Sequence, residues 1–167
     1  MFLSEKTSQA IDEIVGSFFN LNRTVDRMCS VLLNKWSMQR TEQLLHYNHA
    51  HTYPLLADIW SDFKSDCNIP TVYPETHKDD RDYNSLLDMM ETYLKEIGDV
   101  YSMIKITYNI AKDEGDLNAC AMIMDFIPKM TEMISQVITL RDKAEQIEDF
   151  ARYDEYVKNW EIDGVQI

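Results

Sequence analysis

The sequence predicts an all-α fold: one domain built as a bundle of four long helices, followed by a C-terminal helical extension. Apolar residues recur at alternating spacings of four and three along most of the chain, which is the period of helices packed nearly parallel. Gly and Pro number only four each, so long helices with few turns are expected. With 167 residues, 45% of them apolar, the chain can bury a core and suits a single domain over residues 1–167.

The first helix is expected over residues 8–33. Thr7 or Ser8 can cap its beginning, because their hydroxyls accept hydrogen bonds from free backbone N–H groups. Seven apolar residues at strict spacing define its buried stripe: Ile11, Ile14, Phe18, Leu21, Val25, Met28 and Leu32. The stripe loses phase after Leu33, which predicts a tight connection or a kink over residues 33–38.

The second helix is expected over residues 38–66, and it contains three of the four histidines within six residues. Pro54 lies inside it and has no backbone N–H, so the carbonyl of Ala50 loses its helical partner. A disturbance of the helix is therefore predicted at the histidines.

The inner face of this second helix carries a polar group. At about 100° per residue, one stripe contains Leu45, His49, Thr52, Leu56, Ile59 and Phe63. His49 should therefore point into the core, with Glu42 almost directly above it and His46 about 60° round. Carboxylate and imidazole groups that converge inside a bundle are typical of metal sites. The alternative is that His49 is a core histidine hydrogen-bonded to a Tyr or a Glu, with His46 partly exposed. His51, Asp58 and Asp62 point the other way.

Two further helices and an extension complete the pattern. Two prolines and a polar run predict a long connection over residues 67–82. Heptad-spaced apolar residues then predict helices over residues 83–112 and 117–143, joined by a turn in which Gly115 ends one helix and Asp116 caps the next. A more exposed helical extension is expected over residues 144–160, and a loose tail is expected over residues 163–167.

Composition excludes several function classes. A net charge of −13 repels nucleic acid phosphates and anionic membranes and attracts cations, so neither DNA nor a membrane is expected as a partner. The three Cys residues are far apart, and we expect reduced thiols in a cytoplasmic protein. No apolar run suggests a signal peptide or a membrane span. No nucleophile–base pair or phosphate loop stands out, so the one enzyme activity considered is metal-dependent oxidation.

The helix order resembles the ferritin-like layout, in which a long connection joins the second and third of four helices. The stretch Ile110–Ile127, with its acidic Gly115-Asp116 turn, resembles the second half of a ferritin or of a Dps-type miniferritin. Leu45-His46, Tyr53 and Asn68-Ile69-Pro70 are similar to the Leu-His, Tyr and Gly-x-Pro markers of the Dps-type second helix. The resemblance covers roughly residues 10–145.

This resemblance implies a protein that binds iron and oxidises or stores it. It implies stress protection and a homo-oligomer, either a dimer or a dodecameric shell. It also implies a Glu on the first helix, where Glu13 stands but flanks the apolar stripe, and a Glu-x-x-His on the second, whose positions hold Asn48 and His51, or His46 and His49 in a shifted register.

The other two helices depart from the ferritin pattern. The inward Glu expected on the third helix falls on Ile97, with Glu96 one step off the core face. The ligand region of the fourth helix falls on Lys129 and Met130. A Dps-type site would also need a His on the first helix, which has none.

Two functions therefore remain open. The first is an iron-binding, ferritin-like protein, with zinc as another metal its donors could take. Its candidate ligands are Glu13, Glu42, His46, His49, His51, Asp58, Asp62 and Glu96, of which Asp58 and Asp62 could face a neighbouring subunit. The second is a ferritin-like bundle that has lost its metal centre and serves as a binding or structural module.

Overall fold

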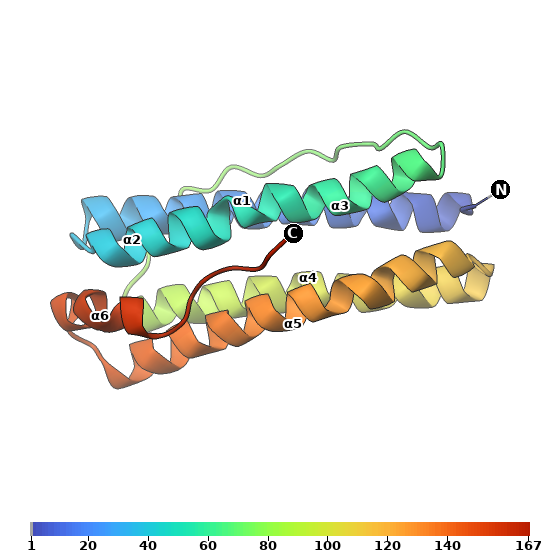
Figure 1. Ribbon diagram of the computed structural model, residues 1–167. Helices are drawn as coiled ribbons and strands as arrows, with labels where there is room; N and C mark the ends of the chain where they lie inside the picture. Colours follow the sequence, from blue (N-terminus) through green and yellow to red (C-terminus); the bar gives the residue numbers. More distant parts are fainter. Residues whose placement is uncertain (1) are drawn as a thin grey trace.

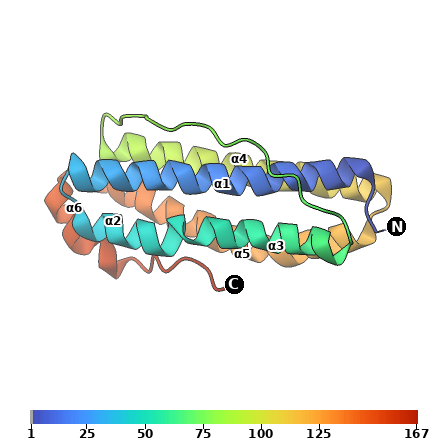
Figure 2. The same ribbon diagram turned by 90° about the horizontal axis from the view of Figure 1, so that it is seen from above.

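Four long helices form two layers in the computed structural model, which describes residues 2–167 (Figure 1). One layer pairs α1 with the second helix, and the other pairs α4 with α5; Figure 2 shows α4 along α1 and α5 along α3. The predicted bundle, its long connection and its extension are confirmed. The helices are α1 (Glu5–Asn34), α2 (Gln39–Leu45), η1 (His46–Ala50), α3 (Thr52–Asp66), α4 (Leu86–Glu114), α5 (Leu117–Gln146), α6 (Phe150–Tyr156) and η2 (Val157–Asn159).

The helix ends differ from the predicted ones where another residue supplies the cap. Ser4, and not Thr7 or Ser8, caps α1, because its Oγ accepts the Thr7 N–H at 3.1 Å. Gly115 ends α4 with a φ of 76°, as expected. The Asp116 side chain makes no capping bond to α5 and instead accepts the Ser4 N–H at 3.0 Å. One carboxylate thus joins the beginnings of α1 and α5.

The connection between α3 and α4, residues 67–85, runs along α1 to return to the other end of the bundle (Figure 2). The Val72 N–H donates to Asp12 Oδ1 at 3.1 Å. The Pro74 ring lies on Gly16, where a Cβ atom would come within 2.8 Å of Pro74 Cγ. A side chain at position 16 would therefore push the connection away from α1.

The second helix contains a wide π-helical turn, η1, at the histidines. The His51 N–H donates to the carbonyl of His46, five residues earlier, at 3.1 Å. The carbonyl of Ala50, which Pro54 leaves without a helical donor, accepts the side-chain amide of Asn22 at 2.8 Å. The predicted disturbance near Pro54 is thus confirmed, and α1 satisfies the group that it exposes.

The π-helical turn also shifts the buried face of α3 by one residue. The stripe predicted from a constant helical period placed Ile59 and Phe63 in the core. Both are only half-buried, whereas Tyr53, Trp60 and Lys64 are buried. A π-helical turn holds one more residue than an α-helical turn, so every later side chain is rotated relative to the α-helical expectation. That part of the predicted stripe was wrong for this reason.

The C-terminal segment is packed, and the expected loose tail was wrong. After a break at residues 147–149, the Tyr153 hydroxyl on α6 donates to the carbonyl of Leu140 at 2.9 Å. The segment after η2 returns toward the middle of the bundle (Figure 1). There the carbonyl of Ile162 accepts the Asn48 side-chain amide at 2.8 Å, and within the predicted tail Gly164 is buried with its N–H and carbonyl bonded to the Gln136 side chain.

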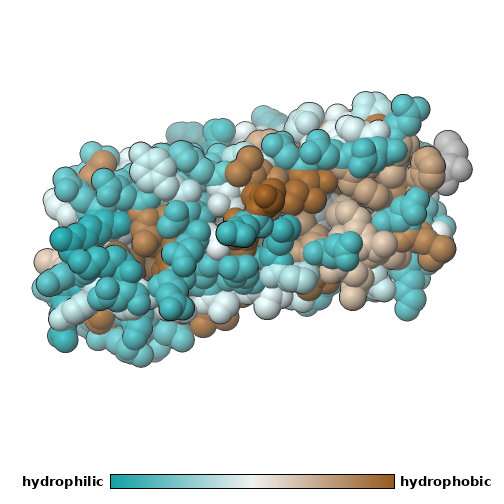
Figure 3. All heavy atoms as spheres, viewed as in Figure 1, coloured by the Kyte–Doolittle hydropathy of each residue, from teal (hydrophilic) through white to brown (hydrophobic). Residues whose placement is uncertain are grey.

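Hydrophilic side chains cover much of the face drawn in Figure 3, with apolar residues gathered between them. Within residues 2–167, every helix is too short or too polar to cross a bilayer.

Candidate metal centre

Four side chains from different elements form one hydrogen-bonded layer inside the bundle. His49 of η1 is fully buried, as its place on the inner stripe predicts. Its Nδ1 lies 2.7 Å from the hydroxyl of Tyr93 on α4, and its Nε2 lies 2.9 Å from Oε1 of Gln136 on α5. The Tyr93 hydroxyl lies 2.5 Å from that of Tyr53 on α3. We call these four residues the His49 layer.

The direction of every hydrogen bond in the His49 layer follows from Gln136. Its Nε2 donates to the carbonyl of Gly164 and its Oε1 accepts the Gly164 N–H, both at 2.9 Å, which fixes the amide orientation. His49 Nε2 must therefore carry a proton and donate to Oε1. His49 Nδ1 is then an acceptor for the Tyr93 hydroxyl, and Tyr93 in turn accepts the hydroxyl of Tyr53.

Burial keeps the His49 layer neutral. Burial of His49 lowers the pKa of its imidazole from 6.5 to about 4, because a charged ring is disfavoured there. Burial likewise raises the pKa values of the Tyr53 and Tyr93 hydroxyls above their usual range. Both imidazole nitrogens already have partners, so His49 could bind a metal only by giving up one of these hydrogen bonds.

The remaining interior does not supply the ligands of a dinuclear iron centre. Such a centre needs about six ligands, mostly carboxylates, on inner faces of the bundle. Ile97 and Met130, which stand where the ferritin pattern expects ligands, are fully buried apolar side chains. The Asp79 side chain is 6% exposed, but it belongs to the connection and pairs with Arg81. Within residues 2–167 the only acidic residues that are buried as a whole are Asp12 and Asp116.

Both of these carboxylates already have partners elsewhere. Asp12 forms a buried ion pair with Lys64 at 2.5 Å, on the side of α1 that faces α3. Asp116 accepts the backbone N–H of Ser4 at one end of the bundle. The donors present therefore do not fit a dinuclear iron centre.

A second group of potential ligands lies between α1 and the beginning of the second helix. Cys29 Sγ, a Glu42 carboxylate oxygen and a His46 ring nitrogen all lie within 4.8 Å of one another. Cys29 is buried, whereas Glu42 and His46 are partly exposed. Burial and the charges of Glu42 and Asp26 raise the pKa of the Cys29 thiol above its usual range. We call Cys29, Glu42 and His46 the Cys29 cluster.

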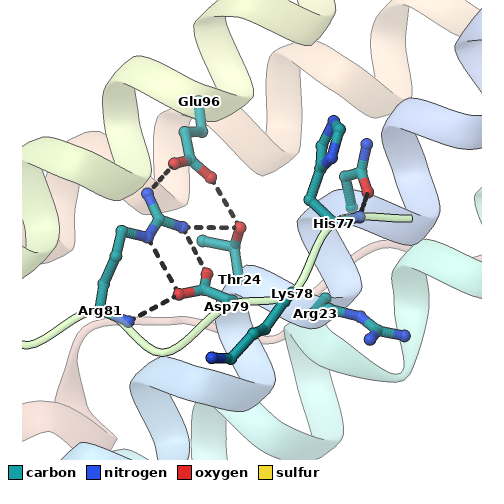
Figure 4. Close-up of a pocket in the computed structure, with 8 residues that line it drawn as sticks. Arg23, Thr24, His77, Lys78, Asp79, Arg81 and Glu96 are labelled. Atoms are coloured by element: carbon teal, nitrogen blue, oxygen red, sulfur yellow. Dashed lines mark hydrogen bonds and ion pairs between the residues drawn. The ribbon is translucent and has the colours of Figure 1, made fainter. Parts of the chain in front are cut away.

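Glu96 of α4 lies outside the interior and belongs to a network of charges under the connection (Figure 4). One of its oxygens pairs with the guanidinium of Arg81, and the other accepts the Thr24 hydroxyl at 2.7 Å. Arg81 also pairs with Asp79 at 2.5 Å. The network adjoins a cavity of about 330 Å³ lined by Asn20, Arg23, Thr24, His77, Lys78, Asp79, Arg81 and Glu96. Arg81, Asp79 and Glu96, which we call the Arg81 network, satisfy one another's charges. The network therefore fastens the connection to α1 and α4, through Thr24 and Glu96.

The other four candidate ligands are exposed. Glu13 lies on the outer side of α1, and Asp58 and Asp62 lie on the outer side of α3. His51 is exposed next to the cluster, with its ring centre 4.5 Å from that of His46. The eight candidates thus divide among the His49 layer, the Cys29 cluster, the Arg81 network and open surface.

Sequence reasoning missed Cys29 and Gln136, and it allowed a Tyr partner for a core His49 without identifying Tyr93. Each lies on or beside an apolar stripe, where it reads as an ordinary core residue. The one available signal was that Cys29 follows Met28, a residue of the inner stripe of α1, and so lies near the face that meets the histidine-containing helix.

Neither a family model nor a curated protein matches the sequence. Solved structures do match over almost their whole length. They include the open-pore ferritin of the hyperthermophilic archaeon Archaeoglobus fulgidus, with 15% identity, 98% of this chain and 99% of that chain covered, and a TM-score of 0.87. A form of that ferritin engineered to be closed is 14% identical, with 99% of both chains covered and a TM-score of 0.87. A humanized archaeal ferritin is 16% identical, with 99% of this chain and 98% of that chain covered and a TM-score of 0.86.

These similarities establish the ferritin-like fold. With 14–16% sequence identity they establish the fold alone. Whether this protein has metal ligands must be decided from its own residues.

Proposed function

We propose that this chain is a ferritin-fold protein that works as a binding or structural module and has no dinuclear iron-oxidising centre. The observation that supports this most directly is the His49 layer. It occupies the interior with a closed set of neutral hydrogen bonds, in which His49, Tyr93 and Gln136 all have partners. Fully buried apolar side chains at Ile97 and Met130 support the same conclusion.

The energetic argument concerns charge. Two ferrous ions would bring four positive charges into the bundle, and carboxylates must offset them in a medium of low dielectric constant. The buried acidic residues Asp12 and Asp116 are engaged with Lys64 and Ser4, and the buried carboxylate of Asp79 is engaged with Arg81. A pair of iron ions in this interior would therefore have uncompensated charge.

The test is aerobic oxidation of Fe²⁺ by the metal-free protein, followed by absorbance, with a ferritin as the positive control. We expect oxidation no faster than in buffer alone and no iron left on the protein after desalting. Oxidation faster than buffer, with about two iron ions retained per chain, would contradict the proposal.

Iron binding and storage is the second candidate function, and the extensive similarity to archaeal ferritins favours it. The net charge of −13 would draw Fe²⁺ to the protein, and Glu13, Asp58 and Asp62 are exposed carboxylates that could bind it between subunits. This candidate includes a Dps-type subfamily and assembly of a homo-oligomeric shell.

Light scattering on freshly purified protein distinguishes the two candidates. A dodecamer of the 19.6 kDa chain would have a mass of about 230 kDa. We expect a monomer or dimer if the chain is a module. A shell that retains iron when it is loaded with Fe²⁺ would favour storage.

A further inference from the structure

The Cys29 cluster brings three different ligand types to one place. Cys29 is on α1, Glu42 is on α2, and His46 is the first residue of η1. The side chains of Glu42 and His46 are 18% and 34% exposed, and Cys29 is buried. The cluster therefore runs from the interior to the surface, and a small ion could reach it from solvent.

One separation between the donors is that expected around a tetrahedral metal ion, and the others lie within reach of it. With bond lengths of about 2.0–2.3 Å, the ligand atoms around tetrahedral Zn²⁺ lie about 3.3–3.6 Å apart. His46 Nδ1 and the nearer Glu42 oxygen are 3.6 Å apart, which is too long for a hydrogen bond and close to that separation. No pair of the three ligand atoms exceeds 4.8 Å, and the two partly exposed side chains can rotate to close the difference.

The charge of Glu42 sets this cluster apart from the other carboxylates near the interior. Asp12 is paired with Lys64, and Glu96 is paired with Arg81. Within residues 2–167, the only ionic partner of Glu42 is His46. A cation at the cluster would supply the positive charge that lysine or arginine supplies to the others.

We propose that Cys29 Sγ, the Glu42 carboxylate and His46 Nδ1 bind one divalent cation of the class that accepts thiolate and imidazole in tetrahedral geometry, of which Zn²⁺ is representative. The mixture of sulfur, nitrogen and oxygen donors favours this class over Mg²⁺ or Ca²⁺, which prefer oxygen. On binding, the Cys29 thiol transfers its proton to water, and the thiolate coordinates the ion. Water takes the fourth position on the exposed side, beside His51.

This site does not depend on the absence of a dinuclear centre, because its residues do not belong to the His49 layer. Its immediate effect would be to join α1 to the second helix at the π-helical turn. Binding to the folded state alone would raise the unfolding temperature as the metal concentration rises.

The test is titration of the reduced, metal-free, full-length protein with Co²⁺, which reports tetrahedral geometry and thiolate ligation by absorbance. We expect saturation at one Co²⁺ per chain, a thiolate-to-metal charge-transfer band in the near ultraviolet, tetrahedral bands in the visible, and displacement by Zn²⁺. Absence of the charge-transfer band would overturn the proposal.

Variants assign the ligands. Cys29→Ser should abolish the charge-transfer band, whereas Cys120→Ser, which removes a half-buried thiol on α5, should leave it unchanged. A band that survives in Cys29→Ser would refute the assignment.

Glu42→Gln and His46→Gln should each weaken Co²⁺ binding at least about tenfold. Both side chains are partly exposed, so these variants decide the matter even if Cys29→Ser does not fold, as circular dichroism would reveal. Unchanged affinity in both would overturn the proposal.

Discussion

Removing one hydroxyl from the His49 layer should have an effect that depends on which tyrosine loses it. In Tyr93→Phe, His49 Nδ1 loses its donor and the Tyr53 hydroxyl loses its acceptor. In Tyr53→Phe, Tyr93 keeps its bond to His49 and only the last link is lost. This difference arises from the direction of the hydrogen bonds in the His49 layer, which the bonds between Gln136 and Gly164 fix.

The magnitudes follow from the number of buried groups left without a partner. Each such group costs about 1–3 kcal/mol, so Tyr93→Phe, which leaves two, should lower the free energy of unfolding by about 2–6 kcal/mol. Tyr53→Phe should cost about 0.5–1.5 kcal/mol, the value of one hydrogen bond. The double variant leaves only His49 Nδ1 without a partner and should cost about 1–3 kcal/mol, less than Tyr93→Phe alone.

Guanidinium unfolding followed by circular dichroism measures all three values on the full-length protein. The informative quantity is the order of the three variants, with Tyr93→Phe the least stable. If Tyr53→Phe were as destabilising as Tyr93→Phe, or if the double variant were the least stable, the deduced proton positions would be wrong.

Three other measurements test the fold. Burial lowers the pKa of His49 from 6.5 to about 4, so as the pH falls the unfolded state binds the proton first, and stability is lost between pH 6.5 and pH 4. Over that range the free energy of unfolding should fall by about 3 kcal/mol relative to that of His49→Gln. Parallel curves of stability against pH for the two proteins would contradict this. Asn22→Ala leaves the Ala50 carbonyl without a donor and should cost about 1–3 kcal/mol in denaturant unfolding, whereas no change would mean that water replaces the amide. Lys64→Met leaves the buried Asp12 carboxylate without its cation and should cost about 3–5 kcal/mol in the same assay, and a loss below 1 kcal/mol would show that solvent reaches this carboxylate.

The bundle could be predicted from the sequence because its evidence is local. The stripe of α1, the long polar connection and Gly115 each follow from a few neighbouring residues. The buried face of α3 could not be predicted correctly, because periodicity assumes that every turn holds the same number of residues. Pro54 indicated a disturbance, but nothing local showed that it would take the form of an added residue.

The candidate ligands could be predicted as residue types but not as groups. Glu42 and His46 lie four residues apart on one helix, so their proximity was expected. Cys29 meets them only because of the rotation of α1 about its own axis, and Gln136 meets His49 only because two layers pack together. The bond between Gln136 and Gly164 depends on how the C-terminal segment folds back, for which the polar tail gives no periodic signal.

The π-helical turn has a consequence for sequence comparison. In a chain of this fold with an unbroken α-helix, residues after the turn would align with this chain only across a one-residue gap within His46–Ala50. An ungapped alignment would match residues that lie about 100° apart around the helix axis, so from Tyr53 onward core positions of one helix would pair with half-buried positions of the other. Removing a single residue from the turn by mutagenesis would likewise rotate Trp60 and Lys64 by about 100°, from the core to the half-buried edge of the helix, although neither side chain had been altered.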